Sequence, residues 1–381
     1  MKKKIIYLIN DIPFFISHRL AIANNAFESG YSINLITGKA ASQTMNNISR
    51  NSEILKRFYI KELNFESSNI NIIKNLFYLF NLYSEFKTIN PTIVHLVSLK
   101  PIILGGITCR LMRINSIVMS FSGLGYLFTG KMNIKTLILK KIVLILLKFI
   151  CKHKKKKIIC QNTIDKEFIL KNNLASEDDI VFIKGSGVDL NLFSNINYNI
   201  KKKTILMPSR ILKNKGVLEF LEAAKILNSK GYEWHFILIG AQDYKNPSSV
   251  DKGILEKYNN KYNIKILDYE NNLIPYFKLA GIVCLPSHRE GMPKSILEGL
   301  ASGIPIVTTN TIGCNESILP GVNGELANLM DPVDLASKLE GLIINSNKRM
   351  RYSIEARKFA IKNYNINDVV KKHLKIYNDF L

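Results

Sequence analysis

The stretch SHREGMPKSILEGLASGIPIV, residues 287–307, carries the most informative structural pattern of the sequence. The apolar run Ile282–Pro286 comes directly before it and predicts a buried strand, which a short polar loop follows. Pro293 suits the first position of a helix because its missing N–H is not needed there, and Gly303 suits the helix end. A strand, a loop and a helix in this order predict one unit of a parallel α/β sheet.

The same pattern recurs along the chain on both sides of a polar linker, Ser194–Lys203. Most of the apolar runs are continuous in Ile, Val and Leu, as in parallel strands that are covered on both faces. The sequence therefore predicts the α/β class with two doubly wound, Rossmann-like domains. The other predicted strands are Lys4–Ile9, Ser32–Thr37, Thr92–Val97, Ser116–Ser120, Lys157–Cys160, Ile180–Ile183, Thr204–Pro208, His235–Gly240, Ile264–Leu267 and Ile304–Thr308.

The composition is that of a globular and strongly basic protein. The 381 residues are 47% hydrophobic, and 53 Lys and Arg against 30 acids give a net charge of +23. A charge of this sign favours an anionic partner such as nucleic acid, anionic lipid or a phosphorylated substrate. The five cysteines show no C-x-x-C spacing and sit mostly in apolar runs, which predicts reduced, buried thiols in the cytoplasm. The N-terminal MKKKIIYLIND is too short in apolar residues for a signal peptide and predicts a strand.

The basic charge is concentrated in one part of the sequence. Between Glu85 and Asp165 there are fourteen Lys and Arg and no acid. Within this interval, Asn133–Lys157 predicts a helix that lies in a membrane interface, with lysines that face anionic headgroups. The alternative is a helix buried against its own sheet and followed by a solvated loop. The lysines expected to face the membrane are Lys140, Lys141, Lys148, Lys154, Lys155, Lys156 and Lys157.

Two glutamates flank the predicted start of the helix in the opening stretch. Glu290 lies on the loop and Glu298 lies inside the helix. The backbone N–H groups at the helix start favour a phosphate or diphosphate, and a carboxylate set back along the helix suits sugar hydroxyls. The alternative is that both acids are solvated and offset neighbouring basic residues. The predicted cradle consists of Gly291, Met292, Pro293, Lys294 and Ser295.

Three segments of the chain resemble glycosyltransferase family 4, the retaining enzymes of the GT-B fold. PSHREGMPKSILEGLASGIPIVTTNTIGCNESILPGVNGEL, residues 286–326, is similar to the region of the family's E-x7-E signature. PSRILKNKGV, residues 208–217, is similar to its Arg and Lys-Gly loop. KGSGVDLNLF, residues 184–193, is similar to its crossover segment, with Ser186 where the family usually has Asn.

The resemblance implies a GT-B fold in which two Rossmann-like domains face a cleft. Residues 1–193 would bind the acceptor and residues 204–362 the nucleotide sugar, while residues 363–381 would form a helix that crosses back to the first domain. In the second domain, Glu298 would hold the ribose and Glu290 the donor sugar.

The resemblance also assigns Arg210 and Lys215 to the leaving diphosphate, whose growing charge preorganised cations stabilise. Ordinary surface charge is the alternative for these two residues. Because no Asp-x-Asp motif occurs, we expect neither a metal ion nor a cofactor. The catalytic candidates are Glu290, Arg210 and Lys215.

Two short motifs of the first domain resemble transferases that act on undecaprenyl-diphosphate-linked sugars. The element FISHR places His18 and Arg19 on the acceptor side, although His18 has an equally good structural interpretation. The turn after the predicted strand Ser116–Ser120 resembles the Gly-Leu-Gly of lipid-linked N-acetylhexosaminyl transferases. It lacks the histidine of many relatives, so no side-chain base is assigned. The residues of this turn are Gly123, Leu124 and Gly125.

Together these features predict a retaining glycosyltransferase that is peripheral on the cytoplasmic face of the bacterial plasma membrane. It would move an N-acetylhexosamine, with α-1,3-linked GalNAc as the favoured case, from a UDP-sugar to an undecaprenyl-diphosphate-linked saccharide during surface-polysaccharide synthesis. Transfer from UDP-glucose, UDP-galactose or GDP-mannose is an alternative. So is a UDP-GlcNAc 2-epimerase of the same architecture, which the acid-free stretch disfavours. A polyanion binder would leave the glutamate and cation pattern unexplained, and no RNA module or zinc motif accompanies the charge.

Overall fold

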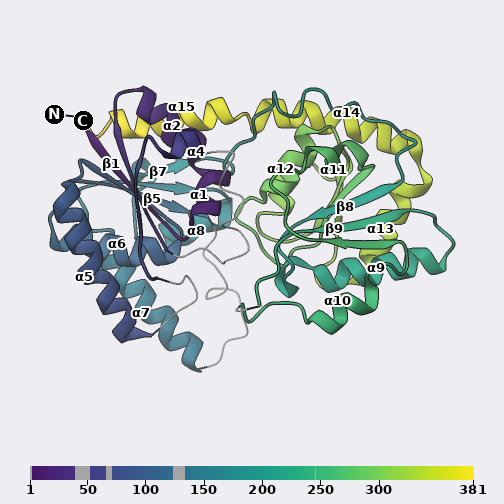
Figure 1. Cartoon of the computed structure of the whole chain (residues 1–381), viewed down its shortest axis with the longest axis horizontal. Coiled ribbons are helices and arrows are strands. Elements are labelled where there is room, and N and C mark those ends of the chain that lie inside the picture. The colour runs from purple at the N-terminus through teal and green to yellow at the C-terminus, as the bar shows by residue number, and fades with distance from the viewer. Residues whose placement is uncertain (1, 39–51, 66–70, 123–133, 245) are drawn as a thin grey trace. The chain divides into compact units, whose positions relative to one another are not determined.

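The computed structural model describes residues 2–38, 52–65, 71–122, 134–244 and 246–381. The chain forms two compact units (Figure 1). Unit 1 comprises residues 1–186 and 368–381, and unit 2 comprises residues 187–367.

Unit 1 is built on a seven-stranded sheet in the order β3-β2-β1-β4-β5-β6-β7, and neighbouring strands pair in parallel. Parallel neighbours need crossover connections, which the helices between the strands supply. The strands are β1 (Lys4–Ile9), β2 (Ser32–Thr37), β3 (Tyr59–Glu62), β4 (Ile93–Val97), β5 (Ser116–Phe121), β6 (Lys155–Cys160) and β7 (Ile180–Phe182).

Helices cover both faces of the unit 1 sheet, with α5, α6 and α7 on one of them (Figure 1). The α6 helix packs on the sheet, and α5 and α7 each contact α6. The described helices of this unit are α1 (Ile12–His18), α2 (Leu20–Glu28), α4 (Ser52–Leu55), α5 (Ile72–Ile89), α6 (Leu99–Leu111), α7 (Ile134–Ile150), α8 (Thr163–Lys171) and α15 (Ile366–Asn378), and η3 (Glu177–Asp179) is a 3-10 turn.

The last helix, α15, packs against the sheet of unit 1. Successive strand residues point to opposite faces, so Leu8 lies toward α6 while its neighbour Tyr7 lies toward α15. The hydroxyl groups of Tyr7 and Tyr377 are 2.7 Å apart, and Tyr377 Oη is also 2.7 Å from Nδ1 of His95. The end of the chain is thus fixed by buried polar contacts to two central strands.

Unit 2 has a six-stranded parallel sheet in the order β10-β9-β8-β11-β12-β13. Its strands are β8 (Thr204–Pro208), β9 (His235–Ile239), β10 (Ile264–Leu267), β11 (Ile282–Leu285), β12 (Ile306–Thr309) and β13 (Gly324–Ala327). Its helices are α9 (Val217–Ser229), α10 (Lys252–Tyr258), α11 (Ile274–Leu279), α12 (Lys294–Ala301), α13 (Pro332–Ile344) and α14 (Ser346–Asn363), with 3-10 turns η4 (Lys213–Lys215) and η5 (Asn315–Ser317).

The buried interior matches the continuous apolar runs of the sequence. All residues of β4, β5, β11 and β12 are buried, as expected of central parallel strands. The five cysteines are free and buried, as their apolar surroundings in the sequence predicted. One edge strand of each sheet, β3 in unit 1 and β13 in unit 2, was not predicted, while the opposite edge strands, β7 and β10, were. The predicted strand that corresponds to β6 began two residues too late.

Candidate active site

The candidate site begins where two neighbouring strands of unit 2 end. Strands β8 and β11 pair in parallel through Ile282 with Ile205, so the loops after them emerge at the same edge of the sheet. The backbone N–H of His288 donates to the carbonyl oxygen of Asn214 over 3.0 Å, and the Ser287 hydroxyl donates to the same oxygen over 3.1 Å. The Arg210–Lys215 loop and the Glu290 loop are therefore joined through their backbones.

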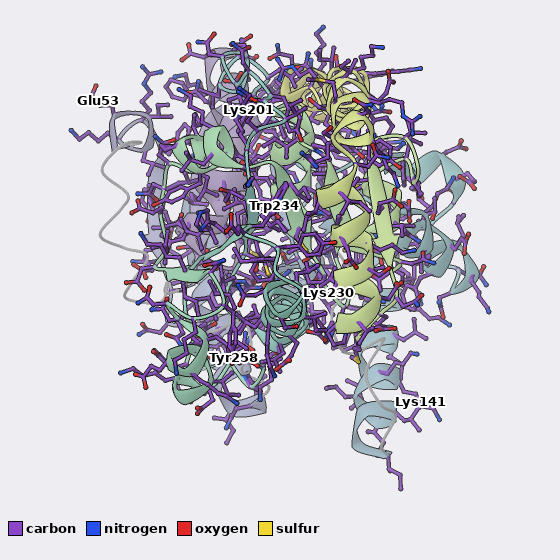
Figure 2. The ribbon with its side chains drawn as sticks, turned by 90° about the vertical axis from the view of Figure 1, so that its right-hand side faces the viewer. Glu53, Lys141, Lys201, Lys230, Trp234 and Tyr258 are labelled. Carbon is purple, nitrogen blue, oxygen red and sulfur yellow. The ribbon has the colours of Figure 1, made fainter. Side chains whose placement is uncertain are left out.

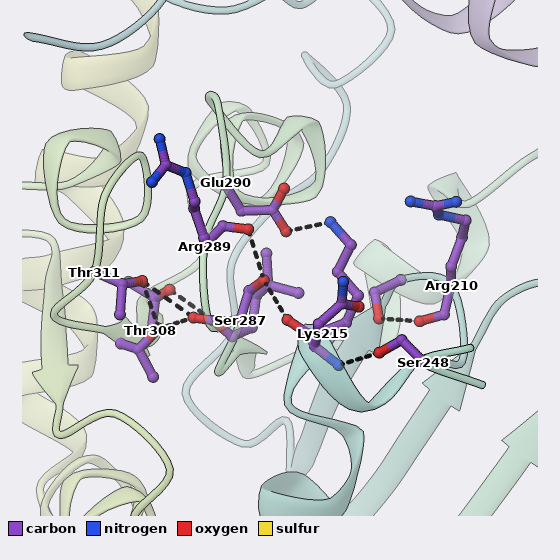
Figure 3. Close-up of polar contacts among 12 residues, drawn as sticks. Arg210, Lys215, Ser248, Ser287, Arg289, Glu290, Thr308 and Thr311 are labelled. Carbon is purple, nitrogen blue, oxygen red and sulfur yellow. Dashed lines mark hydrogen bonds and ion pairs between the residues drawn. The ribbon is translucent and has the colours of Figure 1, made fainter. Parts of the chain in front are cut away.

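Lys215 and Glu290, two predicted catalytic residues, form an ion pair. The distance between Lys215 Nζ and Glu290 Oε1 is 2.5 Å, and their side chains are 17% and 13% exposed (Figure 3). Lys215 ends the η4 turn, and Glu290 lies four residues before α12. The sequence separates the two residues by 75 positions, and the strand order brings them together.

A glycine and a second polar pair fix the loop that carries Lys215. Gly216 has a φ of 76°, and a Cβ at this position would collide with the carbonyl oxygen of Pro286. Only glycine combines this backbone geometry with so close an approach. Beyond it, Nε2 of His288 lies 2.8 Å from Oε1 of Glu219 in α9. Glu219 was not predicted as a site residue, because nothing in its neighbourhood indicates a partner on a loop 69 residues away.

The Glu290 loop is held equally closely on its other side. The Glu290 N–H donates to the carbonyl oxygen of Ile312 over 3.0 Å. Gly313 has a φ of 79°, and a Cβ there would collide with the Glu290 backbone. The Thr311 hydroxyl donates to the Ser287 carbonyl oxygen over 3.1 Å (Figure 3). These contacts on both sides give the Glu290 loop a defined conformation.

The predicted cradle lies at the start of α12. Pro293 is the residue before the helix, with extended backbone at φ −73° and ψ 116°, so the prediction that it begins the helix was wrong by one residue. Within the described parts of the chain, no side chain caps this end. Gly291, Met292 and Pro293 are buried, while Lys294 and Ser295 are half-buried. Met292 Sδ accepts a hydrogen bond from the Ser317 hydroxyl over 3.2 Å, so its side chain belongs to the core.

Glu298 lies in the second turn of α12 and is largely enclosed. Its side chain is 18% exposed, and Oε1 is 3.7 Å from Nζ of Lys294, one turn earlier. Burial raises the pKa of Glu298 above its ordinary value, and the nearby Lys294 ammonium opposes this shift. A largely enclosed carboxylate is suited to accept hydrogen bonds from hydroxyl groups.

Arg210 differs from Lys215 in its surroundings. It is exposed, and its guanidinium makes no hydrogen bond or ion pair with the residues that the structure describes. Figure 3 shows its side chain on the same side of the loops as Lys215 and Glu290. The unit 2 candidates thus comprise a bonded pair, a separate cation on the same loop, and Glu298 within the adjoining helix.

The unit 1 candidates are placed differently from one another. The His18 ring is half-buried, stacks on Phe14 at 4.1 Å between centroids, and has Nδ1 2.6 Å from the Ser17 hydroxyl. Arg19 is only 2% exposed, and its guanidinium donates to the His18 carbonyl oxygen. Because Arg19 is enclosed near Tyr7 and Tyr377, it is a core residue of unit 1. Gly123, Leu124 and Gly125 lie outside the described residues.

The predicted membrane-facing lysines separate into two groups. Lys141, Lys148 and Lys154 are exposed, and Lys140 is half-buried. Lys155, Lys156 and Lys157 form the start of β6, where only Lys155 is exposed. Lys156 is paired with Asp179 at 2.8 Å, and Lys157 donates to the Asp178 carbonyl oxygen. Lys156 and Lys157 therefore make their polar contacts within unit 1.

Two kinds of feature are absent from the described residues. None of the helices among them has both the length and the apolar character needed to cross a membrane. Within the same parts of the chain, no three His, Cys, Asp or Glu side chains gather as they would around a metal ion.

Two Rossmann-like units, each with a parallel sheet, define the GT-B class of folds, and solved structures share it. HepE of Anabaena, solved with UDP and glucose, superposes with a TM-score of 0.78 at 14% identity, over 99% of this chain and 100% of its own. A glycosyltransferase of Rickettsia africae gives 0.73 at 21% identity, over 100% and 99%.

The family models identify both units. Residues 4–162 match the model "Glycosyl transferase 4-like", and residues 191–359 match "Glycosyl transferases group 1". Together the two matches span most of the chain, which belongs to the glycosyltransferases that these models describe.

Two curated relatives cover most of the chain. One is the N,N'-diacetylbacillosaminyl-diphospho-undecaprenol alpha-1,3-N-acetylgalactosaminyltransferase of Campylobacter jejuni, 29% identical over 323 residues and 81% of each chain. The other is the UDP-Gal:alpha-D-GlcNAc-diphosphoundecaprenol alpha-1,3-galactosyltransferase of Escherichia coli, 28% identical over 328 residues and 82% of each.

Proposed function

We propose that the protein transfers an N-acetylhexosamine, with retention of configuration, from a UDP-sugar to a saccharide linked to undecaprenyl diphosphate. α-1,3-linked GalNAc is the favoured product. The bond between the anomeric carbon and the phosphate oxygen breaks, and a bond from that carbon to an acceptor hydroxyl forms. The hydroxyl proton leaves with the departing diphosphate, so the atoms balance without another reactant.

The Lys215–Glu290 pair at the start of α12 is the observation that carries this proposal. When the glycosidic bond breaks, negative charge grows on the diphosphate, and a fixed ammonium stabilises that charge more than the ground state. Arg210, exposed on the same loop, supplies a second cation. The start of α12 has backbone N–H groups that no side chain caps among the described residues, and such groups can donate hydrogen bonds to an anion.

The two glutamates then serve the neutral parts of the donor. Glu298, within the helix, accepts hydrogen bonds from the ribose hydroxyls. Glu290, on the loop, contacts the sugar to be transferred while it holds Lys215 in place. His18 stays a candidate on the acceptor side because its ring is half-buried and not enclosed in the core. Arg19 is better explained as a core residue.

The acceptor proposal rests on the relatives. Both enzymes named above act, by their names, on diphospho-undecaprenol-linked saccharides. A lipid-linked acceptor would place the protein on the membrane as a peripheral enzyme, on the cytoplasmic face of a bacterial plasma membrane. The exposed lysines Lys141, Lys148 and Lys154 support this location, because anionic headgroups attract such residues by about 1 kcal/mol each near the surface.

A donor and acceptor screen tests the proposal. The full chain is incubated with UDP-GalNAc, UDP-GlcNAc, UDP-glucose, UDP-galactose and GDP-mannose, each with a synthetic isoprenoid-diphosphate-linked N-acetylhexosamine. We expect a disaccharide product from a UDP-N-acetylhexosamine, with an α-linkage in its NMR spectrum. Activity in the presence of a chelator tests the expected independence from metal. Product from GDP-mannose alone, a β-linkage, or epimerised UDP-GlcNAc without transfer would refute the assignment.

A further inference from the structure

Helix α5 exposes a row of large apolar side chains. Ile73, Leu76, Phe77, Phe80 and Tyr83 are between 43% and 75% exposed. Their spacing of three and four residues places them on one face of the helix. The opposite face is buried in the core of unit 1, and its residues include Tyr78, Leu82 and Phe86. The helix therefore has two apolar faces, and only one of them is buried within unit 1.

The neighbouring helix α7 shows the same arrangement. Its inner face is buried through Val143, Leu147 and Ile150. The inner face thus agrees with the alternative of a helix buried within its own domain, while the predicted position in a membrane interface stays a prediction. We call the exposed apolar residues of α5 and α7 the outer apolar face. Those of α7, which are 40% to 76% exposed, are Ile134, Leu137, Ile138, Ile142, Ile145 and Phe149.

The two helices belong to one layer of unit 1. Each contacts α6, which packs on the sheet, so α5 and α7 lie on the same side of that sheet (Figure 1). Lys141, labelled in Figure 2, lies near the middle of α7, and its side chain is exposed. Soluble monomers rarely expose apolar patches beyond a few hundred Å², and larger ones mark interaction surfaces.

The charges around this face are mostly of one sign. Lys74 on α5, and Lys141 and Lys148 on α7, are exposed. The one acid in the sequence of these two helices, Glu85, is paired with Lys61 at 3.4 Å and accepts a hydrogen bond from Tyr59. Apolar and aromatic side chains flanked by lysines match the boundary between acyl chains and anionic headgroups of a lipid bilayer.

We propose that α5 and α7 together form a docking face for an anionic phospholipid membrane. The aromatic outer side of α5 enters the headgroup boundary, and the lysines of α7 contact the phosphates. This proposal deepens the proposed function, since it rests on a lipid-linked acceptor for its purpose. A second copy of the chain fits this face less well, because it would bring two sets of lysines together without acids to pair them.

Vesicle co-sedimentation of the full chain tests the proposal. The probes are vesicles of phosphatidylcholine alone and of phosphatidylcholine with phosphatidylglycerol. Phe77→Ser with Phe80→Ser removes apolar area that docking would bury, and we expect binding to the anionic vesicles to fall roughly tenfold or more. Lys141→Gln with Lys148→Gln is expected to lower it roughly tenfold and to reduce its dependence on salt.

Exposed apolar residues of unit 2 provide a matched control. Ile354→Ser with Ile361→Ser alters two half-exposed side chains of α14, and it should leave vesicle binding unchanged. An equal loss of binding in this variant and in the α5 variant would mean that any exposed apolar residue contributes, and it would overturn the assignment to α5 and α7.

Two further measurements separate the possible failures. UDP binding, followed by calorimetry, should be the same in the α5 variant as in the unchanged protein, which shows that the variant is folded and that the proposed donor site is intact. Unchanged vesicle binding by the α5 variant would overturn the membrane proposal, even if UDP still binds. So would sedimentation velocity showing a dimer that the α5 substitutions dissociate, because α5 would then be a protein interface. If the unchanged protein does not bind UDP, the proposed function itself is refuted.

Discussion

Lys215 Nζ and Glu290 Oε1 lie 2.5 Å apart and connect the loops that follow two adjacent strands of unit 2. Both side chains are less than one-fifth exposed, so the Lys215 ammonium has little freedom to move away from Glu290. The pairing holds a cation beside the chain segment that leads into α12. Such preorganisation is useful in catalysis, because the group need not be reoriented as charge develops.

Removing the Lys215 ammonium should therefore affect turnover. We expect Lys215→Ala to lower kcat by about 10²–10³-fold, the cost of deleting one preorganised charge-stabilising group. Lys213→Ala is the matched control, since Lys213 is an exposed lysine of the same η4 turn. Steady-state transfer with the preferred UDP-sugar measures both. Equal losses in the two variants would show a general charge effect and contradict the assigned role of Lys215.

Glu298 should show opposite effects on stability and on donor binding. Burial raises its pKa in the folded protein above the value of about 4.3 in unfolded chains. Since the folded state holds this proton more tightly, ionisation at neutral pH costs folding free energy. Glu298→Gln should thus raise the Tm at pH 7, or leave it unchanged, while it weakens donor binding. The unchanged enzyme should lose donor affinity as the pH falls through the raised pKa, and Glu298→Gln should not. Full donor affinity in the variant would contradict the ribose role.

Gly313 allows a direct test of how closely the Glu290 loop is packed. An alanine there has to adopt a left-handed backbone and also collides with the Glu290 backbone. Gly321 has nearly the same φ, 75°, but its added Cβ meets nothing within 4 Å. We expect Gly321→Ala to lower the free energy of unfolding by about 1–2 kcal/mol and to leave the transfer rate unchanged. Gly313→Ala should cost more and should also lower the transfer rate, as denaturant unfolding and kinetics would show. Equal effects on both measurements would mean that the contact with Glu290 is unimportant.

The parts of the fold that could be predicted from sequence are those that burial determines. Strands such as Lys4–Ile9 and Thr204–Pro208 are continuous apolar runs after their first residue, and the structure has them at the predicted residues. The missed strands, Tyr59–Glu62 and Gly324–Ala327, are short edge strands. All residues of the first are exposed or half-buried, and the two middle residues of the second are half-buried. Such strands form because a neighbouring strand offers hydrogen-bond partners, and their own sequence carries little sign of it.

The candidate site shows the same distinction. The positions of Glu290 and Glu298 relative to a helix could be predicted because loop, proline and helix are consecutive in sequence. The contact of His288 with Glu219 could not, since it depends on which strands are neighbours. The resemblance of the FISHR element implied an acceptor-side role for Arg19, whereas the packing of α15 encloses its side chain near Tyr377.

The return of α15 also predicts sensitivity of unit 1 to acid. Burial lowers the pKa of His373 to about 3, and it lowers that of His95 well below its usual value. Below about pH 6.5 these two histidines therefore bind protons in the unfolded chain but not in the folded chain. The free energy of unfolding consequently falls as the pH falls. Each histidine contributes up to about 1.4 kcal/mol per pH unit in this range.

Replacement of His373 should reduce this acid sensitivity. We expect His373→Phe to make the unfolding free energy less dependent on pH between about 6 and 4, by up to that same slope of about 1.4 kcal/mol per pH unit. His235→Asn, at an exposed position, is the control and should leave the slope unchanged. Urea unfolding at a series of pH values measures how the unfolding free energy changes with pH. A change in stability that the Phe side chain causes equally at every pH does not affect this slope. An unchanged slope in His373→Phe would mean that this histidine is protonated in the folded protein, and the buried contact between α15 and the sheet would then need another explanation.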